Sequence, residues 1–188
     1  MPNVTAMEPQ ILVDLLALAV EDAQVRAPAA RAMVAVISPW LSDVELTLLP
    51  SNRHGALGGG NEAVPLGFGQ CLERLCNLGC DVHIGVLAYN EMFQGLRKEA
   101  AKFSHERAVL RGLLVAGAKV YLCHNLHAKG IVTDLGLITG STNYTRSGVF
   151  LQMQNANYFA YDHSEYRSNK ATLMAYLTDA YRVANVGG

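Results

Sequence analysis

The stretch 121–143, YLCHNLHAKGIVTDLGLITGSTN, constrains the fold more than any other part of the chain. Its short apolar runs at 120–122, 131–133 and 137–139 contain β-branched residues and predict strands. The residues between the last two runs, 134–136, have the composition of a tight turn. The stretch therefore predicts a strand, a turn and a return strand, with polar residues gathered at one end of a sheet.

These polar residues form a set with a chemical meaning. Residues two apart in a strand share a face, so we expect His127 and Lys129 to point into one pocket. The return strand ends in Gly140-Ser141, which brings a hydroxyl, the Asn143 carboxamide and backbone N–H groups to the same end. An imidazole ordinarily titrates near pH ~6.5 and suits a nucleophile or proton carrier. The other groups stabilise developing negative charge, so the set predicts a site for a tetrahedral oxyanion.

At these residues the sequence resembles the phospholipase D superfamily, whose signature is His-x-Lys, four residues, Asp, and then Gly-Ser-x-Asn. The matching positions here are His127, Lys129, Asp134, Gly140, Ser141 and Asn143. Five residues separate Asp134 from Gly140, one fewer than usual, and a turn shortened by one residue leaves the paired strands intact. Each position alone has an ordinary explanation as a surface or turn residue, but their joint spacing favours a functional site.

The resemblance extends upstream to the apolar run 32–37, which ends in Ser38-Pro39-Trp40. A continuous apolar run predicts a buried central strand, and a strand ending in Ser-Pro-aromatic recurs at the start of phospholipase D-like domains. We expect Trp40 to pack in the core, with lining of a substrate cleft as the alternative.

The resemblance implies cleavage or transfer of phosphodiesters through a covalent phosphohistidine, without metal or other cofactor, at a site built from two copies of the signature. This chain carries one copy, so the resemblance implies a homodimer whose two-fold axis passes between two His127 side chains. It assigns His127 as nucleophile or acid, and Lys129, Ser141 and Asn143 as phosphate ligands. We expect Asp134, the remaining member of this catalytic set, to fix its turn or pair with a cation.

One position departs from the small nucleases of the superfamily, in which a glutamate after the Gly-Ser orients the catalytic imidazole. The corresponding stretch here offers Gln154 and Asn155, and Asp162 or Glu165 are alternatives. An amide oxygen can fix the imidazole tautomer, but it stabilises an imidazolium less than a carboxylate does. The rate of such a site therefore depends on which of these side chains orients His127.

The rest of the chain predicts an α/β fold, a mixed sheet flanked by helices on both faces in a single domain over 1–188. Two glycines, Gly79 and Gly117, each stand between a predicted helix and a predicted strand. Helices are expected at 8–26, 70–78, 91–116 with a possible break at 103–104, and 164–183; further strands at 81–87, from 119, and at 157–161. The glycine-rich segment 51–69 is expected to be a mobile loop that could cover the site.

The composition indicates in which cellular compartment the protein is expected. The chain has 188 residues, 51% of them hydrophobic, without an uncharged run long enough to span a membrane. The first ten residues lack the basic region and apolar core of a signal peptide. The four cysteines lack CxxC spacing, so reduced thiols are preferred over a zinc site. Together these features predict a cytoplasmic protein.

The substrate class is less sharply indicated. A net charge of −1 argues against a strongly basic nucleic-acid footprint. For the Lys and Arg residues between 97 and 111 we expect a solvated helix surface, with a basic face beside the site as the alternative. Small single-motif members of the superfamily mostly cleave DNA or RNA, some with partner proteins of defence or DNA-processing systems. A nuclease is therefore expected. The alternatives are a lipid headgroup phosphodiesterase and a non-catalytic module that binds nucleic acid or a partner within a defence complex.

Overall fold

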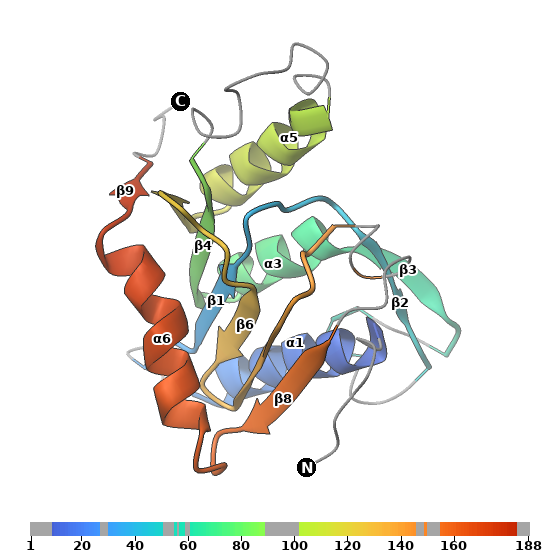
Figure 1. Ribbon diagram of the computed structural model, residues 1–188. Helices are drawn as coiled ribbons and strands as arrows, with labels where there is room; N and C mark the ends of the chain where they lie inside the picture. Colours follow the sequence, from blue (N-terminus) through green and yellow to red (C-terminus); the bar gives the residue numbers. More distant parts are fainter. Residues whose placement is uncertain are drawn as a thin grey trace.

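The computed structural model describes residues 9–26, 30–50, 55, 57–58, 61–88, 102–145, 149 and 155–183. These residues build a seven-stranded mixed sheet in the order β8-β7-β6-β1-β4-β5-β9, with a separate two-stranded sheet of β2 and β3 (Figure 1). The strands are β1 Met33–Ile37, β2 Glu45–Leu48, β3 Val64–Gly67, β4 Asp81–Leu87, β5 Lys119–Cys123, β6 Gly130–Thr133, β7 Gly136–Gly140, β8 Ala156–Ala160 and β9 Tyr181–Arg182. The helices are α1 Pro9–Val25, α3 Phe68–Asn77, α5 Lys102–Val115 and α6 Tyr166–Thr178.

The directions of the strands determine which loops meet. β1 runs parallel to β4, and β4 runs parallel to β5. β6 is antiparallel to β1, β7 to β6, and β8 to β7. The carboxyl ends of β1, β4, β5 and β7 therefore lie at one edge of the sheet together with the amino ends of β6 and β8. We call this edge the carboxyl edge; ligand sites of open α/β sheets form at edges of this kind.

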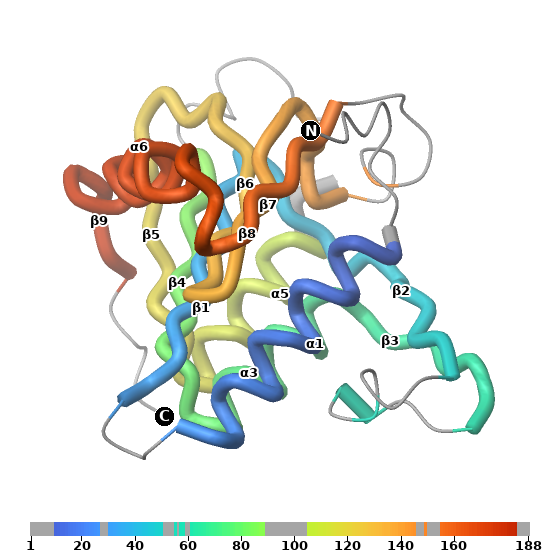
Figure 2. The backbone as a smooth tube through the Cα atoms, turned by 90° about the horizontal axis from the view of Figure 1, so that it is seen from below, coloured from blue at the N-terminus to red at the C-terminus, as the bar shows by residue number. Residues whose placement is uncertain are grey.

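The two faces of the sheet carry separate apolar cores because side chains alternate along each strand. In β1, Val34 and Val36 belong to the core under α1, α3 and α5. Ala35 and Ile37 belong to the core under α6. Figure 2 shows α6 on one side of the sheet and the other three helices on the opposite side. The predicted mixed sheet with helices on both faces is confirmed.

Most predicted elements are present, and two glycines end helices as expected. Gly79 and Gly117 follow α3 and α5 with φ of +83° and +100°, in the left-handed region that favours glycine. α5 passes through 103–104 without the suggested break. Three of the five basic residues between 97 and 111 lie in α5, namely Lys102, Arg107 and Arg111; Arg97 and Lys98 fall in 89–101, outside the described part of the chain.

We had expected the whole segment 51–69 to be a loop, and this is wrong for its second half. Its residues 64–67 form β3, which pairs antiparallel with β2 in register Leu46↔Leu66, and residues 68–69 begin α3. A four-residue strand containing Pro65 and ending in Gly67 gives almost no period-two signal. Within the described residues no helix is long and apolar enough to cross a membrane.

The cysteines are free thiols in apolar surroundings. Cys71, Cys80 and Cys123 are buried, and Cys76 is half-buried. Burial raises the pKa of Cys71 to about 12 and that of Cys123 to about 11. Such thiols carry little thiolate at neutral pH and behave as small apolar side chains.

Candidate functional site at the carboxyl edge

His127 and Lys129 lie in the connection 124–129 between β5 and β6, and not within a strand as the two-residue spacing had suggested. β5 and β6 are separated in the sheet by β4 and β1. Three inter-strand spacings amount to about 14 Å, so this connection crosses the carboxyl ends of both intervening strands. Leu126 is fully buried and anchors its middle, while His127 is exposed.

The bend that begins this connection has an unusual backbone conformation. Asn125 has a φ of +52°, in the left-handed region that asparagine tolerates better than most residues. The bend lets the chain leave β5, bury Leu126 and present His127 to solvent within a few residues.

Lys129 is held at the junction with β6. Its ammonium donates a hydrogen bond of 2.6 Å to the His127 carbonyl. Its own carbonyl accepts hydrogen bonds from the Thr139 hydroxyl at 3.1 Å and from the Gly140 N–H at 3.2 Å. Partial burial lowers the pKa of Lys129 below its ordinary value. The ammonium thus lies beside the backbone of His127, and no carboxylate of the described residues forms an ion pair with it.

Gly140 and Ser141 end the return strand against the start of β8. A Cβ on Gly140 would lie 2.0 Å from the Asn155 carbonyl oxygen, so only glycine permits this approach of the two backbones. The Ser141 N–H donates to the Asn155 carbonyl at 2.9 Å, and the Asn155 N–H donates to the Ser141 hydroxyl at 3.1 Å. The Gly-Ser pair therefore fixes the position of Asn155 at the carboxyl edge.

The residue that orients His127 stays a prediction. Gln154 lies outside the described residues, and Asn155 is exposed and reaches this edge through its backbone contacts with Ser141. The alternatives Asp162 and Glu165 are in the wrong place, because they follow the carboxyl end of β8 at the opposite edge of the sheet.

Asn143 continues the site beyond Ser141. Its side-chain Oδ1 and the Thr142 hydroxyl are buried without a hydrogen-bond partner among the described residues. Tyr144, fully buried, follows them and stacks on Phe68 with 5.7 Å between ring centroids. Because a buried acceptor without a partner is costly, Asn143 retains capacity for a hydrogen bond that the folded chain does not use.

Trp40 belongs to this edge and is not a core residue, contrary to our expectation. Its side chain is 40% exposed, whereas Ser38 before it and Leu41 after it are buried. The segment 38–39 continues beside the end of β4, through bonds from the Ser38 N–H to Gly85 and from the Leu87 N–H to Pro39. The buried Ser38 hydroxyl donates to the Trp40 carbonyl at 2.6 Å and accepts from the Tyr144 N–H at 3.3 Å. One serine thus joins the segment after β1 to the residue that follows Asn143.

Asp134 lies at the opposite end of β6 from His127. Its carboxylate contacts Arg26 and Lys170, each at 3.2 Å, and accepts the Met33 N–H at 3.1 Å. These contacts agree with the pairing that we expected for Asp134 and do not bring it to His127.

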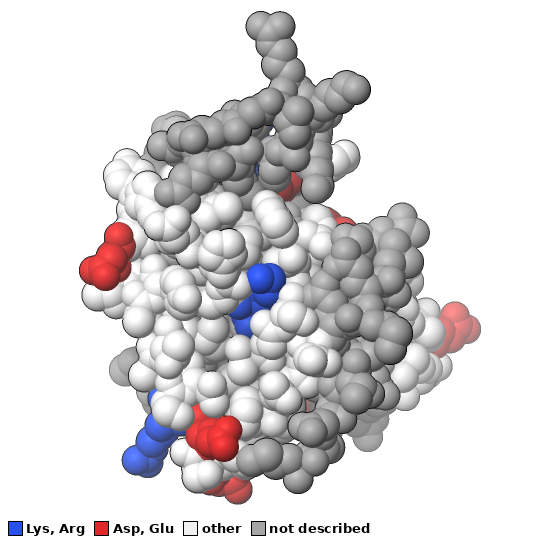
Figure 3. Space-filling view, in the orientation of Figure 1, with Lys and Arg blue, Asp and Glu red and all other residues white. Residues whose placement is uncertain are grey.

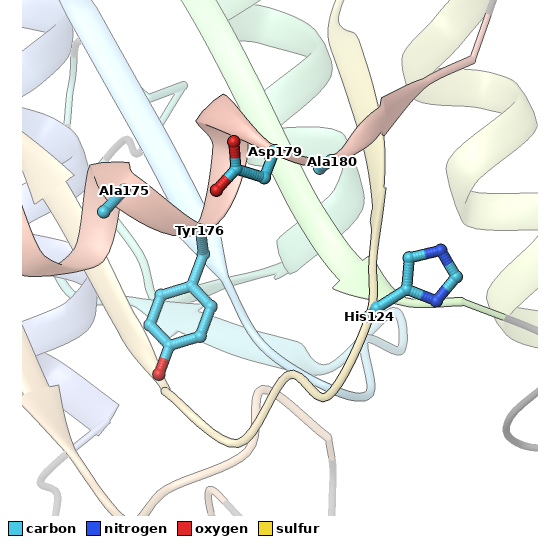
Figure 4. A pocket seen from close by; sticks show the side chains of 5 residues that line it. All are labelled: His124, Ala175, Tyr176, Asp179 and Ala180. Atoms are coloured by element: carbon cyan, nitrogen blue, oxygen red, sulfur yellow. The ribbon is translucent and has the colours of Figure 1, made fainter.

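A cavity of about 300 Å³ lies beside the connection, where the end of α6 approaches the residue after β5. It is lined by His124, Ala175, Tyr176, Asp179 and Ala180 (Figure 4). Sequence reasoning did not select these residues. His124 precedes His127 by three positions in the same stretch, which was the available signal, whereas the residues of α6 carry no spacing that points to a site.

The arrangement can accept an anion but is not strongly basic. The imidazole of His127, the ammonium of Lys129, the hydroxyl of Ser141 and the carboxamide of Asn143 come from the connection and from the end of β7. The face of the molecule seen in Figure 3 is mostly uncharged, with few Lys or Arg among its described residues. Binding of an anionic substrate therefore depends on a few placed groups more than on a broad basic surface.

Comparison with known proteins supports this architecture at the level of the fold. No family model matches the sequence, and no curated protein matches it. Among solved structures, the phospholipase D family member Nuc from Salmonella typhimurium superposes with a TM-score of 0.55 at 14% identity, over 90% of this chain and 88% of that one. NucT from Helicobacter pylori gives a TM-score of 0.50 at 12% identity, over 94% and 93%. The chain therefore has the fold of the phospholipase D family member Nuc.

Proposed function

We propose that the chain is a metal-independent phosphodiesterase that cleaves nucleic acid through a phosphohistidine, at a site shared by two protomers. The observation that carries the proposal is the gathering of His127, Lys129, Ser141 and Asn143 at the carboxyl edge, in the order and near-spacing of the phospholipase D signature. The fold shared with Nuc over most of both chains supports it.

In the proposed first step His127 attacks phosphorus, a P–N bond forms and the bond from phosphorus to the leaving oxygen breaks. The partner subunit's His127 gives its proton to that oxygen. In the second step water attacks phosphorus and passes a proton to the partner subunit's His127, and the P–N bond breaks. The product leaves with a terminal phosphate, and both imidazoles return to their starting states.

The remaining groups stabilise the charge on the phosphoryl oxygens. The Lys129 ammonium lies 2.6 Å from the carbonyl oxygen of His127, and in the proposed mechanism it contacts a phosphoryl oxygen of the bound substrate. Asn143 would supply amide N–H donors to the phosphoryl oxygens, and its side-chain oxygen has no hydrogen-bond partner among the described residues. Donors that are placed before the reaction stabilise the transition state without reorganisation.

A single chain supplies one half of this site, since one copy of the signature is present. An isologous dimer brings the same residue to itself across a two-fold axis. The exposed position of His127 on the connection supports such a role, because a nucleophile shared between protomers must lie at the surface of each.

The proposal is tested by incubating purified protein with single- and double-stranded DNA and RNA in excess EDTA. His127→Asn, which keeps the size and polarity of the side chain, is assayed in parallel, with Asp162→Asn as a control at the opposite edge. We expect cleavage by the wild type and by the control, and none by His127→Asn. Cleavage that requires added metal, or that survives in His127→Asn, would overturn the mechanism. Release of headgroups from mixed micelles with no effect on nucleic acid would overturn the substrate class.

A further inference from the structure

We propose that the indole of Trp40 is a stacking platform for a nucleobase next to the scissile phosphate, and that it makes the site selective for single-stranded nucleic acid. The inference rests on the proposed function, because it names the class of substrate that the same site accepts.

The position of Trp40 follows from the strand that precedes it. The last residue of β1, Ile37, pairs with Gly130, and Lys129 comes directly before Gly130 in the chain. The connection that carries His127 crosses the end of β1, so Trp40 leaves the sheet at the place where the catalytic segment passes. On the other side, the Pro39 carbonyl accepts the Leu87 N–H at 3.3 Å, which ties this segment to the end of β4.

The backbone on both sides of Trp40 is fixed. Before it, the fully buried Ser38 bonds to the Trp40 carbonyl. After it, the Leu41 N–H donates to the buried Glu106 carboxylate at 2.8 Å, and Leu41 forms a bridge with Tyr144. Only the side-chain torsions of Trp40 then remain to be ordered when a ligand binds, which lowers the entropic cost of the contact.

An exposed tryptophan on a rigid segment suits the face of a base. Trp40 is 40% exposed, although a single exposed aromatic residue is not by itself unusual. Its location at the edge with His127 and Lys129 gives the exposure a function. Stacking on aromatic side chains binds bases of any sequence, and the bases of a single strand offer their faces whereas those of a duplex are already stacked.

The electrostatics point the same way. The chain has a net charge of −1, and the face in Figure 3 carries few basic groups among its described residues. Phosphate contacts supply most of the affinity of strongly basic nucleic-acid binders. Where the described residues offer few such contacts, stacking on Trp40 adds binding energy beside the scissile phosphate.

The experiment uses the fact that Trp40 is the single tryptophan of the chain. Short oligonucleotides are added to the His127→Asn protein, which binds without cleaving, and tryptophan fluorescence is read together with the anisotropy of a labelled strand. We expect quenching that follows the binding curve for single strands. An abasic site moved along the strand should abolish the quenching at one position next to the cleavage site.

Matched variants test the same contact by affinity. Trp40→Ala should weaken single-strand binding about ten- to hundredfold, the range expected for the loss of one stacked base. Trp40→Phe should restore most of the loss. Tyr161→Ala, which removes an aromatic residue that is 61% exposed at the opposite edge, should change nothing. In Trp40→Ala, the abasic substitution should cost no further affinity.

Several outcomes would overturn the inference. Two results together would exclude the stacking platform and leave the proposed nuclease intact: single strands bind His127→Asn tightly without changing its tryptophan fluorescence, and Trp40→Ala binds them with unchanged affinity. Equal affinity for duplex would remove the selectivity. A fall of Trp40→Ala to monomer mass in light scattering would assign the exposed ring to the subunit interface instead. Absence of both binding and cleavage of every nucleic acid by the wild type would count against the proposed function itself.

Discussion

At the scale of single residues, Lys129 links the burial of a charge to the pH range of activity. Removal from water disfavours the charged form, so burial lowers its pKa below the ordinary 10.5. A bound phosphate supplies an opposite charge and raises it again. Activity should therefore fall on the alkaline side as Lys129 loses its proton, and the fall in kcat/KM, which reports the free enzyme, should begin at lower pH than the fall in kcat.

The lowered pKa of Lys129 also determines how the stability of the folded protein changes with pH. The pKa of Lys129 is lower in the folded state than in the unfolded state, so carrying the proton destabilises the folded protein. This cost to the free energy of unfolding is complete below the folded-state pKa and is gone above the unfolded-state pKa. Lys129→Arg keeps its charge at all these pH values, so it should move the alkaline loss of activity to higher pH. An alkaline limb that is identical in wild type and Lys129→Arg would show that another group controls it.

At the scale of elements, Asp134 joins parts of the fold that are distant in sequence. Its carboxylate contacts Arg26 after α1, Lys170 in α6 and the first N–H of β1 at Met33. Asp134→Asn weakens both ion pairs at once while its side-chain amide keeps one acceptor. We expect the free energy of unfolding to fall by about 1–3 kcal/mol, the range for charged hydrogen bonds that lose a partner.

The activity of the remaining folded Asp134→Asn protein should be unchanged, because Asp134 lies at the end of β6 away from His127. Urea unfolding followed by circular dichroism measures the first quantity, and cleavage below the transition measures the second. Asp162→Asn, an exposed carboxylate on the turn after β8, is the control and should stay within about 0.5 kcal/mol of wild type. Loss of turnover without loss of stability would place Asp134 in the catalytic machinery.

Elements with a strong apolar period could be predicted from the sequence, and those without one could not. β1 and β4 are continuous apolar or alternating runs, and α1 has a long helical pattern. β3 contains a proline, and β9 is a two-residue strand that pairs with Tyr121 and Leu122 through the tertiary fold. Such strands form because the backbone of a neighbouring strand has unpaired hydrogen-bonding groups beside them. The local sequence does not encode this neighbour.

The candidate site shows the same division. The spacing from His127 to Asn143 was enough to gather four functional groups at one edge. It did not reveal that His127 and Lys129 stand on a connection that crosses two strands, because that depends on the strand order. Trp40 was expected in the core on composition alone, and its exposure follows from how the chain leaves β1.

At the scale of the whole molecule, the proposed function makes a testable demand on the number of subunits, because the chain carries one copy of the signature. If each site requires both His127 side chains, a dimer of one wild-type and one His127→Asn subunit is inactive. If each protomer acts alone, that dimer keeps half of its activity. The two models therefore differ in how activity depends on the fraction of wild-type subunits, even when every species is a folded dimer.

We expect activity to fall as the square of that fraction when tagged wild-type and His127→Asn subunits are unfolded together and refolded as a random mixture. At equal amounts the mixture should retain about a quarter of the activity of refolded wild type, as random pairing in an isologous dimer requires. The folded-protein yield and the dimer mass are measured for each mixture, and wild type diluted with Asp162→Asn serves as the control, which should show no loss. A linear decline to about half, with dimers present throughout, would mean that each protomer holds a complete site; His127 would then act with a second acid from its own chain, and the two-fold axis would have no role in the chemistry.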